Sequence, residues 1–158
     1  MEYITVTGIK KLNEKLDKLR ASLPEVVKLV SVAREMGDLS ENAEYHAAHE
    51  RKRNIENEID YISSRLTKLQ VIDTTKMDAS AVRFGFCVKV KEKQSGELTN
   101  YILVGVDEID FYFGADLTPI SFLSPLGKAI IGKKEGEDFV VSAPMKDIEY
   151  SVVKIWRG

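Results

Sequence analysis

The sequence predicts an α+β protein of two domains: an antiparallel α-helical coiled-coil hairpin over residues 1–75 and a β-rich globular domain over residues 76–158. In the first half, apolar residues repeat at alternating spacings of three and four along two long runs, the pattern of a coiled-coil seam. A short acidic stretch separates the two runs. Beyond residue 75 the period changes to two and turn residues separate short apolar segments, which is typical of a small sheet.

Composition limits the class of protein. The chain has 158 residues, of which 44% are hydrophobic and 30% charged, as expected for a globular protein. No apolar run approaches the roughly 20 residues that a helix needs to cross a bilayer. The first residues lack a basic region followed by an apolar run, so we expect no secretory signal and a cytoplasmic location. The single cysteine, Cys87, is expected to be a small buried hydrophobe rather than a reactive thiol.

The net charge of −2 is spread evenly along the chain. Residues 1–75 contain 12 basic and 13 acidic side chains, which leaves 11 and 12 of the totals of 23 and 25 for the rest. Neither half is a polycation, so any contact with nucleic acid must come from a local patch.

The first helix is predicted to begin after Thr7, whose hydroxyl is a suitable N-cap. Pro24 does not shift the phase of the seam, so we expect a kink or a brief break within one helix rather than two independent helices. The seam positions are Ile9, Leu12, Leu16, Leu19, Leu23, Val26, Val30 and Ala33.

The second run carries the same alternation. Two seams of similar length joined by a tight turn can bury each other only when the helices are antiparallel. Each arm of roughly 28 residues would be about 40 Å long. Its seam positions are Tyr45, Ala48, Lys52, Ile55, Ile59, Ile62, Leu66 and Leu69.

The turn between the helices allows two interpretations. Asp38 and Glu41 have the spacing of a capping box at the start of the second helix, with Gly37 ending the first helix in a left-handed conformation. Alternatively, the two carboxylates at the end of a long rod bind a hard divalent ion such as Mg²⁺. Two carboxylates alone do not form a tight site, so another molecule would have to supply the remaining ligands. The spacing alone leaves both interpretations open.

The C-terminal half predicts short strands with one helix among them. The helix has Ser124 as N-cap, Pro125 at its first position and Gly132 after its end. Turns are expected at residues 94–97 and 135–138. The predicted strands are 82–84, 86–90, 101–104, 120–122, 139–141 and 153–155.

Two stretches resemble the signatures of one family. Residues 33–48 resemble the tip of the bacterial Gre transcript cleavage factors, nearer the GreA type than the GreB type, and residues 120–133 resemble the family's second signature, a Ser-Pro turn with a short helix. The two signatures occur in the right order and distance. The resemblance implies an FKBP-like globular domain and a coiled coil that enters the secondary channel of RNA polymerase.

The resemblance also implies roles for particular residues. Asp38 and Glu41 would act as catalytic carboxylates that share an Mg²⁺ ion with the polymerase, so that water cleaves backtracked RNA. No cofactor would be bound stably by the protein alone. Ser124 and Pro125 would dock on the β′ subunit at the channel rim. The polymerase remains the enzyme, and this factor is expected to be a monomer.

Arg51, Lys52 and Arg53 form the basic cluster of the hairpin. The residues alone allow a solvated helix face, whereas the resemblance implies contact with the 3′ segment of the nascent RNA.

The sequence also allows other functions. A protein of the same fold could occupy the channel without promoting cleavage, although both tip carboxylates argue against such an inhibitor. A coiled-coil adaptor or chaperone would not involve polymerase. A peptidyl-prolyl isomerase is a weaker alternative, because a fold does not carry an activity. Residues 107–114, with three consecutive aromatics, depart from the family pattern.

Overall fold

The computed structural model describes residues 2–37, 42–112, 114 and 116–158. Contacts between Cα atoms divide it into two units, one of Lys10–Leu69 and one of Met1–Ile9 with Gln70–Gly158. This division differs from a boundary at residue 75, because residues 1–9 and 70–75 group with the C-terminal unit. Among the described helices, none is long and apolar enough to cross a membrane.

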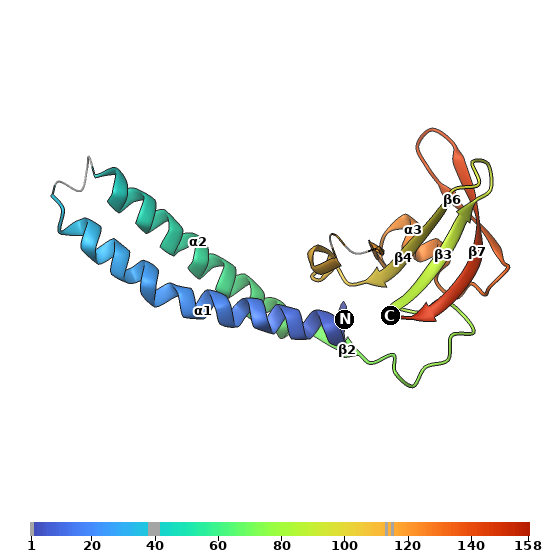
Figure 1. Ribbon diagram of the computed structural model, residues 1–158, viewed down its shortest axis with the longest axis horizontal. Coiled ribbons are helices and arrows are strands. Elements are labelled where there is room, and N and C mark those ends of the chain that lie inside the picture. The colour runs from blue at the N-terminus through green and yellow to red at the C-terminus, as the bar shows by residue number, and fades with distance from the viewer. Residues whose placement is uncertain (1, 38–41, 113, 115) are drawn as a thin grey trace. The chain divides into compact units, whose positions relative to one another are not determined.

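The first unit is a hairpin of two long helices, α1 (Val6–Arg34) and α2 (Ala43–Leu66), which run side by side (Figure 1). The prediction of one helix through Pro24 is confirmed, since Pro24 lies inside α1. Lys15 on α1 pairs with Glu58 on α2 at 2.9 Å. The buried seam residues are Leu12, Leu16, Val26, Val30 and Ala33 on α1 and Ile62 on α2.

The start of α1 corrects the predicted cap. Thr7 is not the N-cap, because the helix begins at Val6 directly after the strand β1 (Glu2–Thr5). The hydroxyl of Thr5 accepts a hydrogen bond from the backbone N–H of Gly8 at 2.9 Å, which is the bond an N-cap makes. The strand holds the backbone extended up to Thr5, so the cap falls at the residue where the strand ends.

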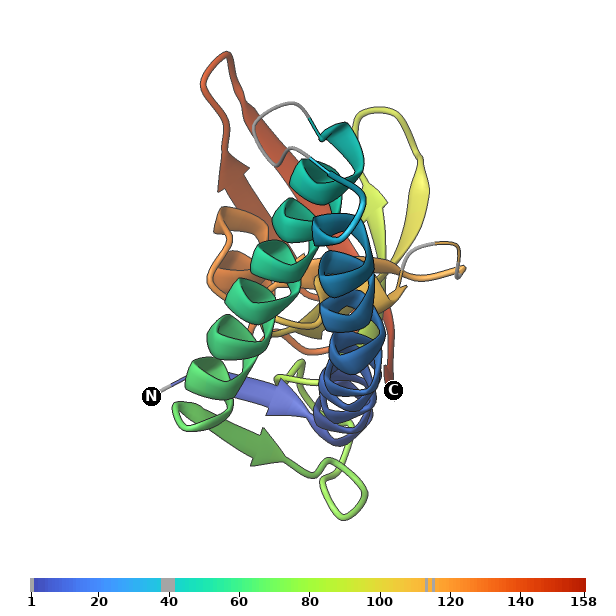
Figure 2. The same cartoon turned by 90° about the vertical axis from the view of Figure 1, so that its left-hand side faces the viewer.

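The end of α2 corrects the predicted seam. Leu69 is not helical, because α2 ends at Leu66 and residues Leu69–Ile72 form the strand β2. This strand pairs with β1 in a two-stranded sheet (Figure 2). This sheet was not among the predicted elements, because residues 1–75 were expected to form the helical hairpin alone. Each strand has only four residues, so neither shows a recognisable alternation.

The second unit is built on a five-stranded sheet of order β5-β4-β3-β7-β6 (Figure 1). All neighbours are antiparallel except β4 and β5, which are parallel. A bulge in β7 between Val152 and Lys154 shifts its register against β3. The strands are β3 (Phe86–Glu92), β4 (Leu98–Val104), β5 (Thr118–Ser121), β6 (Asp138–Ser142) and β7 (Asp147–Arg157).

The predicted strand at residues 82–84 is wrong. Val82 is buried in the core, but the segment forms no strand. Instead, the backbone of Val82 exchanges hydrogen bonds with the turn after the helix α3 (Pro125–Ile130): its N–H donates to Lys133 and its carbonyl accepts from Gly132, both at 2.8 Å. The apolar pattern predicted the burial of Val82 correctly. The backbone hydrogen bonds of Val82 depend on a distant segment, which the pattern could not indicate.

The sheet carries side chains of different kinds on its two faces. One face packs against α3 and forms the main core, which includes Phe86, Leu103 and Ile130, each at 0% exposure. The other face carries a smaller cluster in which Cys87 lies. The expectation that Cys87 is a buried hydrophobe is confirmed, and burial raises the pKa of its thiol to about 11. The α+β architecture with an N-terminal helical hairpin is likewise confirmed.

Candidate functional site

The end of the hairpin is shaped by Asn42. Its side-chain oxygen accepts a hydrogen bond from the N–H of Tyr45 at 3.0 Å, so Asn42 is the N-cap of α2. Its amide nitrogen donates to the carbonyl of Ala33, which lies in the last turn of α1. One side chain therefore ties the end of the first helix to the start of the second.

This geometry corrects the capping-box interpretation. An Asp38 cap would place the start of α2 next to Asp38, but the helix begins at Ala43 and Asn42 makes the capping bond. Gly37 has a φ of +131°, which L side chains rarely adopt, but α1 ends three residues earlier at Arg34, so Gly37 is not the left-handed residue that was expected to end the helix. Asp38 and Glu41, the predicted catalytic and metal-binding residues, lie outside the described residues.

An aromatic and cationic cluster borders the same end. The guanidinium of Arg34 lies 5.7 Å from the centre of the Tyr45 ring, and the rings of His46 and His49 lie 5.5 and 5.8 Å from it. Tyr45, in the first turn of α2, thus lies beside Arg34, the last residue of α1. Within the described residues, no three His, Cys, Asp or Glu side chains form a group that could hold a metal ion.

The three residues of the basic cluster have different surroundings. Lys52 pairs with Glu56 at 3.4 Å, and Arg53 pairs with Glu50, both on the same helix. For Arg51, no ion pair is found among the described residues. Of the three residues predicted to contact RNA, Arg51 is therefore the one whose positive charge is most available to an external phosphate.

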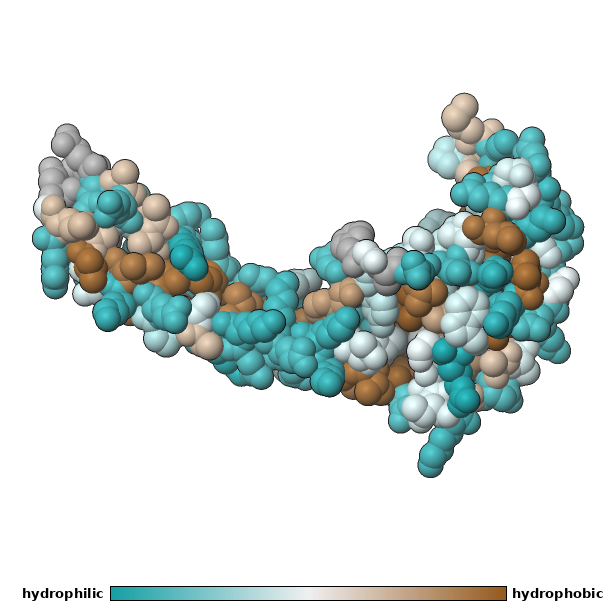
Figure 3. All heavy atoms as spheres, in the orientation of Figure 1, coloured by the Kyte–Doolittle hydropathy of each residue, from teal (hydrophilic) through white to brown (hydrophobic). Residues whose placement is uncertain are grey.

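Arg51 also lines an apolar groove of about 330 Å³ near the end of the hairpin. Leu29, Val32 and Met36 contribute exposed side chains to it, with exposed fractions of 49%, 47% and 65%. The hydrophobic surface of this part of the hairpin is visible in Figure 3. The groove was not predicted from the sequence, because its exposed apolar residues lie beside the seam and not in it. The apolar residues at spacings of three and four beside the seam were the available signal.

The predicted docking residues lie at the start of α3. The Ser124 hydroxyl accepts from the N–H of Gly127 at 3.1 Å and donates to the carbonyl of Ser121 at 2.7 Å, which confirms it as the N-cap. Both of its hydrogen-bonding roles are satisfied within the domain. Pro125 is exposed, and Leu123 beside it is 49% exposed. Ser124 therefore shapes the turn, while Leu123 and Pro125 form its surface.

Glu108 is a buried carboxylate that the sequence analysis did not single out. It is 0% exposed, and its oxygens accept from the N–H of Thr5 at 2.9 Å, the N–H of Gly105 at 3.0 Å and the Thr5 hydroxyl. Burial raises the pKa of this carboxyl, and the hydrogen bonds oppose the rise. A Cβ at Gly8 would lie 2.3 Å from a Glu108 oxygen, so glycine is needed there.

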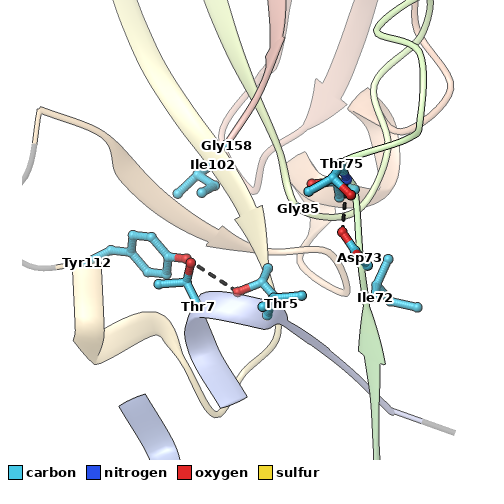
Figure 4. Close-up of a pocket in the computed structure, with 11 residues that line it drawn as sticks. Thr5, Thr7, Ile72, Asp73, Thr75, Gly85, Ile102, Tyr112 and Gly158 are labelled. Carbon is cyan, nitrogen blue, oxygen red and sulfur yellow. Dashed lines mark hydrogen bonds between the residues drawn. The ribbon is translucent and has the colours of Figure 1, made fainter. Parts of the chain in front are cut away.

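A cavity of about 250 Å³ adjoins this buried cluster (Figure 4). The hydroxyls of Thr5 and Tyr112 lie 3.5 Å apart on one side. On the other side, the Asp73 carboxylate accepts from the N–H of Thr75 at 3.0 Å, and hydrogen bonds from Thr75 lower the pKa of Asp73. Its polar lining is largely satisfied within the protein, which favours a structural role.

Comparisons with known proteins agree on one family. The family profile "Transcription elongation factor, N-terminal" matches residues 2–71, and "Transcription elongation factor, GreA/GreB, C-term" matches residues 77–157. The chain is 43% identical over 152 residues to the transcription elongation factor GreA of Nitratidesulfovibrio vulgaris (strain DP4), covering 96% of this chain and 91% of that protein. It is 42% identical over 161 residues to GreA of Rhodospirillum rubrum, covering 100% of both. Among solved structures, GreA factor homolog 1 (Gfh1) of Thermus thermophilus matches with a TM-score of 0.43 and 25% identity over 98% of both chains.

Proposed function

The chain belongs to the GreA/GreB family of transcription elongation factors, and from this premise we propose that it stimulates RNA cleavage by bacterial RNA polymerase. In this proposal the hairpin enters the secondary channel of the polymerase, and the polymerase cleaves its own backtracked transcript. The new RNA 3′ end then lies in register for extension. The observation that carries the proposal is the hairpin end, where Asn42 joins two long helices across the acidic stretch.

The length of the hairpin supports this proposal. The 29 residues of α1 correspond to about 43 Å at 1.5 Å per residue. Its seam is continuous through Pro24, and Lys15 and Glu58 link the two helices. A narrow rod of this length can present a few side chains far from the domain that anchors it.

Asp38 and Glu41 are the proposed functional carboxylates. Their oxygens are ligands that Mg²⁺ accepts, and the described residues nearby offer no complete metal site, so the polymerase would supply the other ligands. The shared ion would activate water for attack on the phosphodiester. The part played by this chain is positioning: the side chain of Asn42 ties together the two helix ends between which the acidic stretch lies.

The remaining contacts follow from the surroundings of each residue. Arg51 is the proposed main contact with the RNA 3′ segment, because Lys52 and Arg53 are paired with acids on their own helix. Leu123 and Pro125 would dock on the β′ subunit at the channel rim, and Ser124 would hold their turn in shape.

A cleavage assay on stalled, backtracked polymerase complexes tests the proposal. Asp38→Ala and Glu41→Ala should each slow cleavage roughly 10- to 100-fold, as expected for a lost metal contact, while polymerase binding persists. Glu35→Ala removes another exposed carboxylate at the end of α1 and serves as the matched control. It should leave cleavage near the wild-type rate.

Other outcomes would identify a different function. Cleavage that is unaffected by both substitutions, with binding retained, would refute the carboxylate mechanism. Slower elongation with no added cleavage would indicate an inhibitor that occupies the channel. If immobilised protein recovered no polymerase subunit from a bacterial lysate, an adaptor without a role at the polymerase would be favoured.

A further inference from the structure

The sheet face opposite α3 carries a group of lysines in its centre. Strand residues alternate between faces, so Lys89 and Lys91 share the face of Cys87 on β3. Lys154 on β7 lies directly opposite Lys89, and Ser151 lies opposite Lys91. Directly opposed residues have Cβ atoms about 5 Å apart, and the two lysines of β3 are about 7 Å apart along the strand. We call Lys89, Lys91 and Lys154 the lysine face.

Carboxylates lie near the lysine face, and one of them, that of Glu135, accepts a hydrogen bond from the N–H of Ile155, next to Lys154, at 2.9 Å. On the other side of Lys89 the opposed residue is Asn100, which is uncharged. Asp138 lies opposite Ser151, in the same cross-strand row as Lys91, and Glu149 is two residues before Ser151 on β7. Both carboxylates are paired with Lys93. Among the described residues, none of the three lysines takes part in an ion pair. Like charges directly opposed on a sheet destabilise it, so the Lys89–Lys154 pair costs the domain free energy.

Apolar groups border these charges. Leu98 on β4 lies opposite Lys91 and is 54% exposed, and Val153 in the bulge beside Lys154 is 45% exposed. Trp156 packs on the Cys87 cluster, and the ammonium of Lys154 lies 5.6 Å from the centre of its ring. The face thus combines a compact positive charge with exposed apolar side chains.

We propose that the lysine face binds an acidic protein segment whose carboxylates alternate with apolar residues. Charge complementarity supports this partner, because its carboxylates would offset the repulsion between Lys89 and Lys154. A nucleic acid fits less well. Duplex DNA presents one charge per roughly 1.7 Å and needs many cationic contacts, whereas this domain has no excess of basic residues. The contacts of Trp156 with the cluster and with Lys154 leave its ring unsuited to stacking on a base.

This binding surface is separate from the hairpin end and from the turn at Ser124, and it does not rest on the function proposed above. The substitution that tests it is Lys154→Glu in the full chain. The new carboxylate would lie opposite Lys89 and form a favourable cross-strand pair. The variant also loses the contact of Lys154 with the Trp156 ring, so it should melt within roughly 3 °C of the wild type while it loses binding, and unfolding cannot explain the loss.

Binding is measured by fluorescence anisotropy with a labelled peptide of repeated Asp-Asp-Leu, at two salt concentrations. We expect salt-sensitive binding that Lys154→Glu weakens about tenfold. Lys10→Glu, on the exposed surface of α1, changes the net charge by the same amount and should bind like the wild type. A peptide of repeated Asn-Asn-Leu should not bind.

Four results would overturn the proposal. The first is equal peptide binding by wild type and Lys154→Glu, and the second is equal weakening by Lys10→Glu, which would indicate a net-charge effect. A melting temperature of Lys154→Glu more than roughly 3 °C below that of the wild type would show that Lys154 stabilises the sheet and is not destabilised by Lys89. Binding of a labelled oligouridylate in place of the peptide, lost in Lys154→Glu, would assign the face to nucleic acid.

Discussion

The hairpin and the sheet unit bury their apolar side chains in different ways. In the hairpin one seam faces one partner helix, and its buried residues retain between 1% exposure, at Val26, and 7%, at Val30. In the sheet unit the core is enclosed by the sheet, α3 and the segment around Val82, and its exposure ranges from 0% at Phe86 and Leu103 to 6% at Phe139. A core enclosed from several directions removes more apolar surface from water than a single seam.

The difference explains what each unit can expose or hide. With one partner only, α1 leaves Leu29, Val32 and Met36 at the surface, where another molecule can contact them. The sheet unit can instead hold the carboxylate of Glu108 away from water, because three donors surround it. The hairpin therefore leaves apolar side chains available for contact, whereas the sheet unit encloses a polar group in its interior.

The largest expected effect is in the enclosed core. Leu103→Ala should lower the free energy of unfolding by about 4 kcal/mol, because the surrounding sheet and helix cannot collapse into the cavity. Fluorescence of Trp156, the only tryptophan, reports on this unit during urea unfolding. If the loss were no greater than for a seam residue of the hairpin, the contrast between the two units would be wrong.

Removal of the buried carboxylate should have the next largest effect. Glu108→Ala leaves the N–H groups of Thr5 and Gly105 without their acceptor, at a cost of about 3 kcal/mol in unfolding free energy. Glu108→Gln keeps an acceptor and should lose less. Urea unfolding of both variants measures the difference, and equal losses would show that the hydrogen bonds contribute little.

The same residue gives the stability a dependence on pH. Because burial raises the pKa of Glu108 in the fold, the folded chain holds a proton that the unfolded chain has already released. The resulting stabilisation is complete below the unfolded pKa of about 4.3 and is lost as the pH rises through the folded pKa. Glu108→Gln does not titrate and should reduce the fall in unfolding free energy from acid to neutral pH. An unchanged slope would contradict this.

A seam substitution should cost less than the core substitution. Leu16 is 4% exposed, and Leu16→Ala is expected to destabilise the hairpin by about 2 kcal/mol, at the low end for such changes, because two helices can close part of the cavity. Far-UV circular dichroism, dominated by α1 and α2, follows the loss. A loss as large as that of Leu103→Ala would mean that the hairpin packs as tightly as the sheet unit.

The smallest expected effect is at the end of the hairpin. Asn42→Ala removes the N-cap of α2 and the bond to Ala33, and should cost about 1 kcal/mol. Asn42→Asp keeps the capping acceptor and loses only the amide donor, so it should cost less. Helix content and thermal melting check the order of the two variants. If it were reversed, the bond to Ala33 would matter more than the cap.

Local patterns were sufficient wherever a structure depends on near neighbours. The seam from Leu12 to Ala33 and the Ser124–Pro125 start of α3 follow from helical periodicity and capping chemistry within a few residues. Asp38 and Glu41 were singled out as a candidate site by the resemblance to the Gre family and not by their spacing, and their role stays a prediction. Their alternative interpretation as a capping box was wrong, because Asn42, one residue before α2, makes that bond.

The sequence by itself therefore determined the helical hairpin, the β-rich second domain and the capped start of α3. Only the tertiary structure decided that Thr5 caps α1, that Leu69 lies in a strand, that Glu108 is buried and that Lys154 faces Lys89. Each of these depends on a partner far away in the sequence, or on a register that a bulge shifts. Periodicity records which side of an element is buried, and it contains no information about which distant segment buries it.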